Sequence, residues 1–185
     1  MKESKIIKGL QKGDQKVLRY LYDHYGNLFF GIAQRYLSDI SEAEDAVQET
    51  FIKIYKNAGT FKNKGSFEGW MKRILVNNCL NRIKANRGNV VMENLDDQIT
   101  ENATISHEEI LEKLHSQEII EVIQNLPTGY RTVLNLYVLE GYAHKEIAEM
   151  LGIQESASRS QLVKARARLK KELVKFGLIS SERVA

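Results

Sequence analysis

Residues 144–163 read HKEIAEMLGIQESASRSQLV, and this stretch decides the fold of the C-terminal part of the chain. Ile147, Ala148 and Leu151 recur at three- and four-residue steps, the spacing of one buried face of a helix. Gly152 follows where the chain must turn sharply, because glycine adopts a left-handed backbone without the penalty of a Cβ atom. A helix, a glycine turn and a second helix in succession predict a helix-turn-helix.

The second helix of this motif is predicted from about Glu155 to Phe176. Its buried face is expected to consist of Leu162, Ala165, Leu169, Leu173 and Phe176. The other faces carry Ser158, Arg159, Gln161, Lys164, Arg166 and Arg168. Arginine, glutamine and serine hydrogen-bond to base edges and phosphates when a helix lies in the DNA major groove. These residue types favour DNA binding over the alternative, an ordinary amphipathic helix with a solvated basic face.

Two further positions complete the motif. Ile153 is expected to fill the corner between the two helices. Ser158 departs from the usual pattern, because many helix-turn-helix motifs carry an aliphatic residue at this position. Ala157 beside it is the alternative packing residue.

Outside this motif, the clearest helix is predicted over 42–57. Ser41 and Glu44 have the spacing of a capping box at its start. Its apolar stripe consists of Ala43, Ala46, Val47, Thr50, Phe51 and Ile54. A longer helix with the same periodicity precedes it, over 17–36.

The helix after this pair is expected to begin with Ser66 as its N-cap and to end near Ala85. Helical periodicity resumes at 110 and ends at Leu126, because the residue before a proline disfavours helical dihedral angles. Pro127, the only proline of the chain, then precedes a helix over 130–139.

The segment over 89–109 is polar, acidic and weakly periodic, a composition that suits a flexible linker. The alternative is a short ordered acidic segment that lies on one of the basic surfaces. The predicted fold class is therefore all-α, with two small helical domains. The first covers 1–88 and the second 110–185, and the acidic linker joins them.

Composition excludes several classes of protein. With 43% hydrophobic and 28% charged residues, the chain resembles a soluble globular protein, and it has no apolar run long enough to span a bilayer. The N-terminus lacks the features of a signal peptide, so we expect a cytoplasmic protein without membrane insertion. Cys79 is the only cysteine and the four histidines lack ligand spacing, so we expect no metal, cofactor or catalytic site.

Two sets of residues resemble a known family. The stretch LPTGYRTVL (126–134), followed by EGY (140–142), IA (147–148) and LGI (151–153), closely resembles region four of extracytoplasmic-function (ECF) sigma factors. The stretch AEDAVQETF (43–51) resembles their region two, and residues 61–78 are similar to the rest of that region. Motifs from two modules in the right order are more specific than a lone helix-turn-helix.

The resemblance implies a non-catalytic subunit that directs RNA polymerase to promoters. It implies that region two is a helical bundle that binds the clamp helices of the β′ subunit of core RNA polymerase and captures the unwound promoter element near −10. Region four would read the element near −35. Family members are commonly held inactive by an anti-sigma factor, so such a partner is expected, although the acidic linker could instead provide self-inhibition. When bound to RNA polymerase, the protein would be associated with the nucleoid.

The resemblance and the helical spacing together assign residues to these roles. The outward face of the helix over 42–57 carries Asp45, Gln48, Glu49 and Ile52, which would bind the polymerase. The residues expected at the −10 element are Lys62, Asn63, Lys64, Lys72, Arg73 and Asn77. The loop over 61–66 would hold an extruded base, whereas Trp70 is expected in the core.

Two other functions compete with this one. A stand-alone operator-binding regulator would form a tight homodimer on two-fold-symmetric sites, and nothing in the sequence resembles a zipper. A nucleic-acid hydrolase would need converging acids or metal ligands, and Asp45 with Glu49 on one helix face is too little for that.

Overall fold

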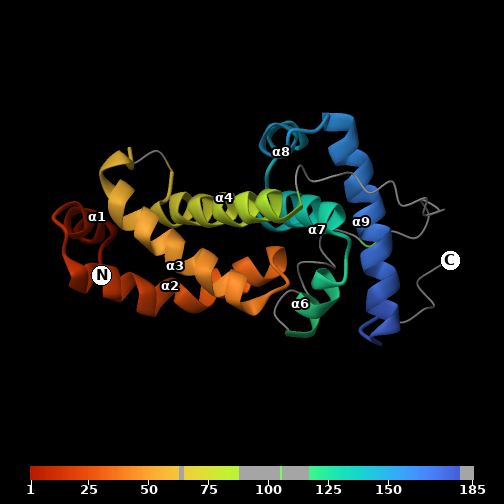
Figure 1. The fold of residues 1–185 in the computed structure, drawn as a ribbon, viewed down its shortest axis with the longest axis horizontal. Helices are drawn as coiled ribbons and strands as arrows, with labels where there is room; N and C mark the ends of the chain where they lie inside the picture. The colour runs from red at the N-terminus through yellow and green to blue at the C-terminus, as the bar shows by residue number, and fades with distance from the viewer. Residues whose placement is uncertain (63–64, 88–104, 106–116, 180–185) are drawn as a thin grey trace. The chain divides into compact units, whose positions relative to one another are not determined.

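The computed structural model describes residues 1–62, 65–87, 105 and 117–179, and every regular element within these ranges is a helix (Figure 1). The chain divides into two compact units, Met1–Ile83 and Lys84–Ala185. The predicted all-α class with two helical domains is therefore confirmed. Apart from Ile105, the segment predicted as the linker lies outside the described residues, so the domain bounds at 88 and 110 stay predictions.

The first unit is built on an antiparallel pair of helices joined by a tight turn. Phe29 and Phe51 stack between α2 and α3 with their ring centroids 5.4 Å apart, and both rings are buried. Aromatic packing of this kind anchors a helix interface because each ring removes a large apolar area from water. The helical elements of this unit are α1 (Glu3–Gln11), α2 (Gln15–Tyr36), α3 (Ile40–Asn57), η1 (Ala58–Thr60) and α4 (Phe67–Arg87).

The N-cap of α3 differs from the prediction. Asp39 Oδ1 accepts a hydrogen bond of 2.9 Å from the backbone N–H of Glu42, so the helix begins at Ile40 and the predicted capping box at Ser41 is wrong. An aspartate satisfies the exposed N–H groups of a helix start as well as a serine does. The N-cap predicted for α4 is confirmed, because Ser66 Oγ accepts from the backbone N–H of Gly69 at 3.0 Å.

Helix α1 was not predicted from the sequence. Its buried residues Ile6, Ile7 and Leu10 have helical spacing, which was a usable signal among the alternating charges. The helix packs against α2 and η1 and so covers one end of the first unit.

The second unit contains the helix-turn-helix. Gly152 adopts the left-handed conformation at the end of α8, with a φ angle of +70°, as the sequence predicted. Its N–H donates to the carbonyl of Ala148 at 2.9 Å, which satisfies one of the last acceptors of the helix. The helical elements are α6 (Gln117–Gln124), α7 (Thr128–Leu134), η3 (Asn135–Leu139), α8 (His144–Leu151) and α9 (Glu155–Lys175).

Two details of this unit differ from the prediction. The helix expected over 130–139 begins at Thr128, and its last five residues form the π-helix η3 rather than an α-helix. Of the five residues expected on the buried face of α9, four are buried, but Phe176 is 41% exposed because α9 ends at Lys175 and the chain leaves helical geometry there. None of the helices that the structure describes is both long and apolar enough to cross a membrane.

Candidate polymerase-binding and nucleic-acid interfaces

The outward face of α3 is as the sequence predicted for three of its four residues. Asp45 and Gln48 are exposed, and Ile52 has half of its surface in solvent. Tyr22 of α2 is also about half exposed beside this helix, and its ring lies 5.2 Å from that of Phe51. Aromatic side chains such as Tyr22 are enriched at surfaces that bind a protein.

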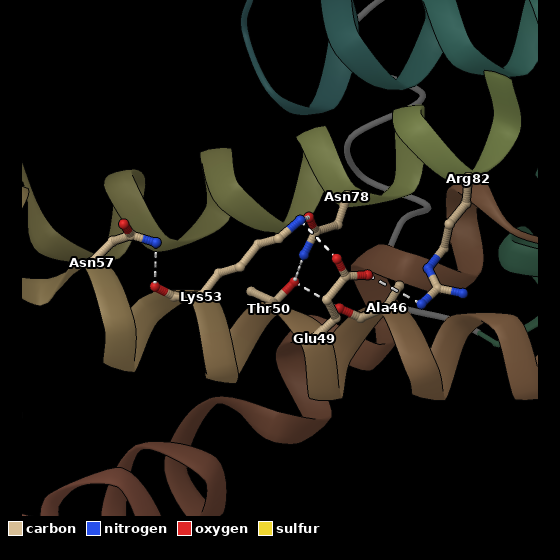
Figure 2. Close-up of polar contacts among 7 residues, drawn as sticks. All are labelled: Ala46, Glu49, Thr50, Lys53, Asn57, Asn78 and Arg82. Atoms are coloured by element: carbon tan, nitrogen blue, oxygen red, sulfur yellow. Dashed lines mark hydrogen bonds and ion pairs between the residues drawn. The ribbon is translucent and has the colours of Figure 1, made fainter. Parts of the chain in front are cut away.

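The fourth residue of this face, Glu49, is engaged inside the unit (Figure 2). Its carboxylate accepts from Lys53 Nζ at 2.7 Å and from Arg82 at 3.2 Å. The hydrogen bond from Lys53 is the largest cause that lowers the pKa of Glu49, and the charge of Arg82 adds to it. Glu49 therefore stays ionised at neutral pH and links α3 to α4, which the sequence interpretation, a polymerase contact, did not foresee.

A buried polar cluster continues this link (Figure 2). Asn78 of α4 donates to Thr50 Oγ1 at 2.8 Å and accepts a hydrogen bond from Lys53, while the Thr50 hydroxyl donates to the carbonyl of Ala46 at 2.7 Å. Thr50 and Asn78 are 0% and 3% exposed, so the bonds that Thr50 makes with Asn78 and Ala46 are shielded from water. Buried polar groups that satisfy one another fix a unique helix pairing, because any sliding of α4 would leave them without partners.

The cluster makes a stability prediction. The Asn78→Ala substitution is expected to lower the free energy of unfolding by about 1–3 kcal/mol, because it removes a buried hydrogen bond to Thr50 and a partly buried one from Lys53. Chemical denaturation followed by circular dichroism would measure the change. Asn81→Ala is the matched control, since Asn81 is an exposed asparagine on the same helix. Equal small losses in the two variants would contradict the role given to Asn78.

A groove lies beside the outward face of α3. It has a volume of about 560 Å³ and is lined by residues of α2 and α3, including Leu18, Tyr22, Phe51 and Ile52. A second hollow of similar size shares Tyr22 and Gln48 with it. The exposed face of α3 therefore continues into a partly apolar depression.

The residues expected at the −10 element divide into three groups. Arg73 and Asn77 are exposed one turn apart on α4, and Lys62 is exposed before this helix. Lys72 is half-buried, and its Nζ pairs with Glu68 at 2.8 Å. Asn63 and Lys64 lie outside the described residues.

Three aromatic rings lie at the start of α4. Phe67 and Trp70 stack at 5.4 Å, and Phe61 lies 5.3 Å from Phe67 and 5.6 Å from Trp70. Phe61 and Phe67 are buried, whereas Trp70 is only half-buried. Trp70 therefore packs as expected on its aromatic neighbours but keeps part of its ring at the surface beside Arg73.

On α9 the structure separates the six residues predicted to face DNA. Arg159 is exposed and pairs with Glu155 at 2.5 Å, and Lys164 is partly exposed without an ion pair among the described residues. The Arg166 guanidinium lies 6.0 Å from the centre of the Tyr137 ring. Arg168 Nε pairs with Glu172 at 3.4 Å.

The outward placement of Ser158 and Gln161 is wrong. They are 0% and 4% exposed, because α9 packs against α7 as well as α8. The Gln161 amide lies 3.4–3.5 Å from the point where a Cβ on Gly129 would be, so it fills space against the start of α7. Ser158 lies in the position where an aliphatic residue was expected, and its hydroxyl is 2.8 Å from His144 Nδ1.

Two family models match this chain. The model for sigma-70 region 2 matches residues 21–88, and the model for sigma-70 region 4 matches residues 116–169. The two regions follow one another in the order of the two structural units. The chain belongs to the sigma-70 family, among its ECF sigma factors. This sigma factor thus carries the α3 face and the exposed part of α4 in region 2, and the helix-turn-helix in region 4.

Curated relatives match the sigma factor over most of its length. It is 28% identical to the ECF RNA polymerase sigma-E factor of Haemophilus influenzae, over 91% of this chain and 93% of that protein. It is also 28% identical to the ECF RNA polymerase sigma factor SigW of Bacillus subtilis, over 91% and 95%. The sigma-E factor of Escherichia coli is 29% identical over 87% and 88%. These relatives and both regions make the chain an RNA polymerase sigma factor, a promoter-specificity subunit.

Solved structures share the fold. The sigma factor RpoE of Bartonella quintana, solved in complex with the anti-sigma factor NepR, superposes with a TM-score of 0.54 at 20% identity, over 84% of this chain and 96% of that one. CnrH, solved in complex with the cytosolic domain of CnrY, gives 0.51 at 22% identity, over 92% and 96%. At these identities the likeness shows the fold alone.

The described part of the sigma factor contains no group of three or more histidine, cysteine, aspartate or glutamate residues that could hold a metal ion. Sigma factors are transcription initiation factors rather than catalysts.

Proposed function

We propose that region 2 of this sigma factor binds core RNA polymerase through the α3 face formed by Asp45, Gln48 and Ile52. The observation that carries this proposal is an exposed isoleucine on the same helix face as an exposed acid and an exposed amide, and this face continues into the groove beside α2. A partner of basic and apolar character fits such a face, and the clamp helices of the β′ subunit are the partner that the family resemblance implies. Glu49 lies one turn from Asp45 and ties α3 to α4 by pairing with Arg82.

We further propose that α4 binds the promoter element near −10. Arg73 and Asn77 are exposed on one face, where a cation can follow the phosphate backbone and an amide can read a base edge. The half-buried ring of Trp70 lies beside them and offers a surface on which an unpaired base can stack. Lys72 would have to leave Glu68 to reach DNA, so its contribution is smaller.

In region 4, α9 is proposed to read the element near −35 with Arg159, whose side chain stays 63% exposed while it pairs with Glu155, and with the partly exposed Lys164. Arg166 and Arg168 contribute mainly to packing, since each is held against a neighbouring side chain of the unit. Each region by itself offers only a few side chains that can contact promoter DNA. Binding to duplex DNA by the free chain is therefore expected to be weak, and core polymerase raises the effective concentration of each contact.

The proposal also covers the cellular location and the regulatory partner of the protein. The protein acts in the cytoplasm on nucleoid DNA and has no enzymatic activity of its own. The two solved structures described above are of complexes, one with the anti-sigma factor NepR and one with the cytosolic domain of CnrY. An anti-sigma factor that covers region 2 or region 4 is proposed as a partner here as well.

Run-off transcription with purified core polymerase tests this function. The full chain is mixed with core polymerase and a library of random DNA, and the transcripts are sequenced. We expect two conserved elements, near −35 and near −10, upstream of the start sites. A chain that neither bound core polymerase nor changed its start sites would overturn the proposal, and a tight homodimer on two-fold-symmetric DNA would support an operator-binding regulator instead.

A more specific prediction concerns α9. The Arg159→Ala and Lys164→Ala double substitution is expected to reduce transcription that depends on the −35 element by about tenfold, because it removes two DNA contacts. The selected promoter and a copy with a scrambled −35 element would be compared in the run-off assay. Lys171→Ala with Lys175→Ala is the matched control, since both lysines are exposed near the other end of the same helix. Equal losses in the two variants would show that only net charge matters.

A further inference from the structure

His144 lies at the first position of α8, in the joint between the two helices of the helix-turn-helix. It is 9% exposed, and its Nδ1 is 2.8 Å from the hydroxyl oxygen of Ser158 on α9. Tyr137 of η3 covers a face of the imidazole, and the two rings stack with their centroids 4.4 Å apart. One histidine thus connects three elements, and neither the sequence patterns nor the proposed function uses it.

The side chains around His144 depend on one another for their contacts. The Ser158 side chain is completely buried, and the site that it occupies would suit an aliphatic residue in many such motifs. A buried hydroxyl without a partner is costly, so the bond to His144 satisfies both groups at once. Tyr137 is in turn covered by the Arg166 guanidinium from α9, which holds the ring on the imidazole. A small rotation of α9 relative to α8 would break this set of contacts.

The surroundings of His144 disfavour a positive charge on the ring. The ring is buried, it lies in the first turn of α8 where the helix dipole opposes a cation, and Arg159 and Arg166 of α9 both carry positive charge toward it. Glu155 of α9 acts in the other direction, and the two charged neighbours on α8 itself are Lys145 and Glu146. Burial is the largest cause, followed by Arg159, and together they lower the pKa of His144 below its ordinary value of 6.5.

We propose that His144 is a positioning residue for α9: its hydrogen bond to Ser158 and its stacking on Tyr137 fix the angle between the two helices, and uptake of a proton by the ring loosens α9 and weakens its contact with DNA. This inference rests on the proposed role of α9 at the −35 element. Because the neutral ring is favoured in the folded chain, the joint is fully formed above pH 6.5 and loses stability as the pH falls below that value. The protein would thereby lose upstream promoter contact in an acidified cell.

The first test uses the full chain without DNA. His144→Phe keeps an aromatic ring on Tyr137 but removes the hydrogen bond and the titration, and Ser158→Ala removes only the hydroxyl. The two substitutions together form a double-mutant cycle in denaturant unfolding, with Ser160→Ala as the control because Ser160 is an exposed serine of the same helix. We expect a coupling of about three- to tenfold in the unfolding constant at pH 7.5, the range of one hydrogen bond. Strict additivity would overturn the joint.

The second test uses the holoenzyme. Transcription from the selected promoter is divided by transcription from the copy with a scrambled −35 element, at several values between pH 7.5 and pH 5.5, so that effects of pH on the polymerase itself cancel. For the wild-type chain we expect this ratio to fall by about three- to tenfold toward the acidic end, because the buried joint beside Arg159 and Arg166 disfavours a charged ring, and to stay constant for His144→Phe. If His144 had only a structural role, His144→Phe would give a lower ratio than the wild type at every pH, and the ratio would change with pH in the same way in both proteins.

The outcomes separate the two proposals. A wild-type holoenzyme that uses the scrambled promoter equally well at all pH values would overturn the −35 role of α9 and, with it, the functional part of this inference. A holoenzyme that requires the −35 element equally at pH 7.5 and pH 5.5 would overturn the role of His144 alone. A falling ratio in the wild type and in Ser160→Ala, with a constant ratio in His144→Phe, supports it.

Discussion

Replacing Asp45 and Ile52 together with alanine is expected to weaken binding of this sigma factor to core RNA polymerase by about a hundredfold, the loss of two central interface residues. Both side chains point into solvent from α3, so the chain should fold as before. The exposed isoleucine would lose its burial in the interface and the partner's basic residues would lose their acid. Fluorescence anisotropy of the labelled full chain, titrated with core polymerase, would measure the change.

A matched control exists on the same helix. Ile40 is likewise an exposed isoleucine, it lies in the first turn of α3, and it lines neither hollow beside the assigned face. The Ile40→Ala variant should bind core polymerase as the wild type does. If Ile40→Ala lost as much affinity as the Asp45 and Ile52 double variant, the binding surface would not be the face assigned here. Glu49 is left unchanged in this experiment because its loss would also disturb the pairing of α3 with α4.

The second large effect is expected on α4. The Arg73→Ala and Asn77→Ala double substitution should reduce the affinity of the holoenzyme for the unpaired −10 strand by about a hundredfold, since each lost base or phosphate contact contributes about 1–3 kcal/mol. The measurement is binding of the holoenzyme to a labelled single-stranded oligonucleotide that carries the selected −10 sequence. Binding of core polymerase should be unchanged because neither residue lies on the α3 face.

Conservative variants separate charge from base reading at these positions. Arg73→Lys keeps the cation, so a phosphate contact should survive it whereas a bidentate contact to a base should not. Asn77→Asp keeps the size of the side chain but removes its hydrogen-bond donors and adds a negative charge near the phosphates. Full binding by the double alanine variant would refute the assignment of this face to DNA.

Much of the fold was predictable because its signals are local. The periodicity that predicted α3 and α9 and the glycine that ends α8 depend on residues within a few positions of one another, and the structure confirms all three elements. The N-cap of α4 was found for the same reason. The start of α3 was misassigned by two residues, since Ser41 and Asp39 both have side chains that can cap a helix and the sequence gives no ranking between them.

The candidate sites were less predictable, because contacts between distant residues decide them. Glu49 has the spacing of an outward residue, yet Arg82 reaches it from α4, 33 positions further along the chain. His144 looked like an isolated histidine until α9 brought Ser158 against it. No local pattern contains either pair.

The sequence by itself determined an all-helical chain with a helix-turn-helix near its end and an acidic, partly apolar face on α3, because helix formation, glycine turns and amphipathic faces are properties of short segments. Only the tertiary structure decided which outward residues remain available for a partner. Ser158 and Gln161 are buried because α9 packs against more than one neighbouring helix. The apolar stripe read from the sequence predicts contact with only one of these helices. The number of helices that pack around α9 depends on the whole unit, so burial of its polar residues could be seen only in the folded protein.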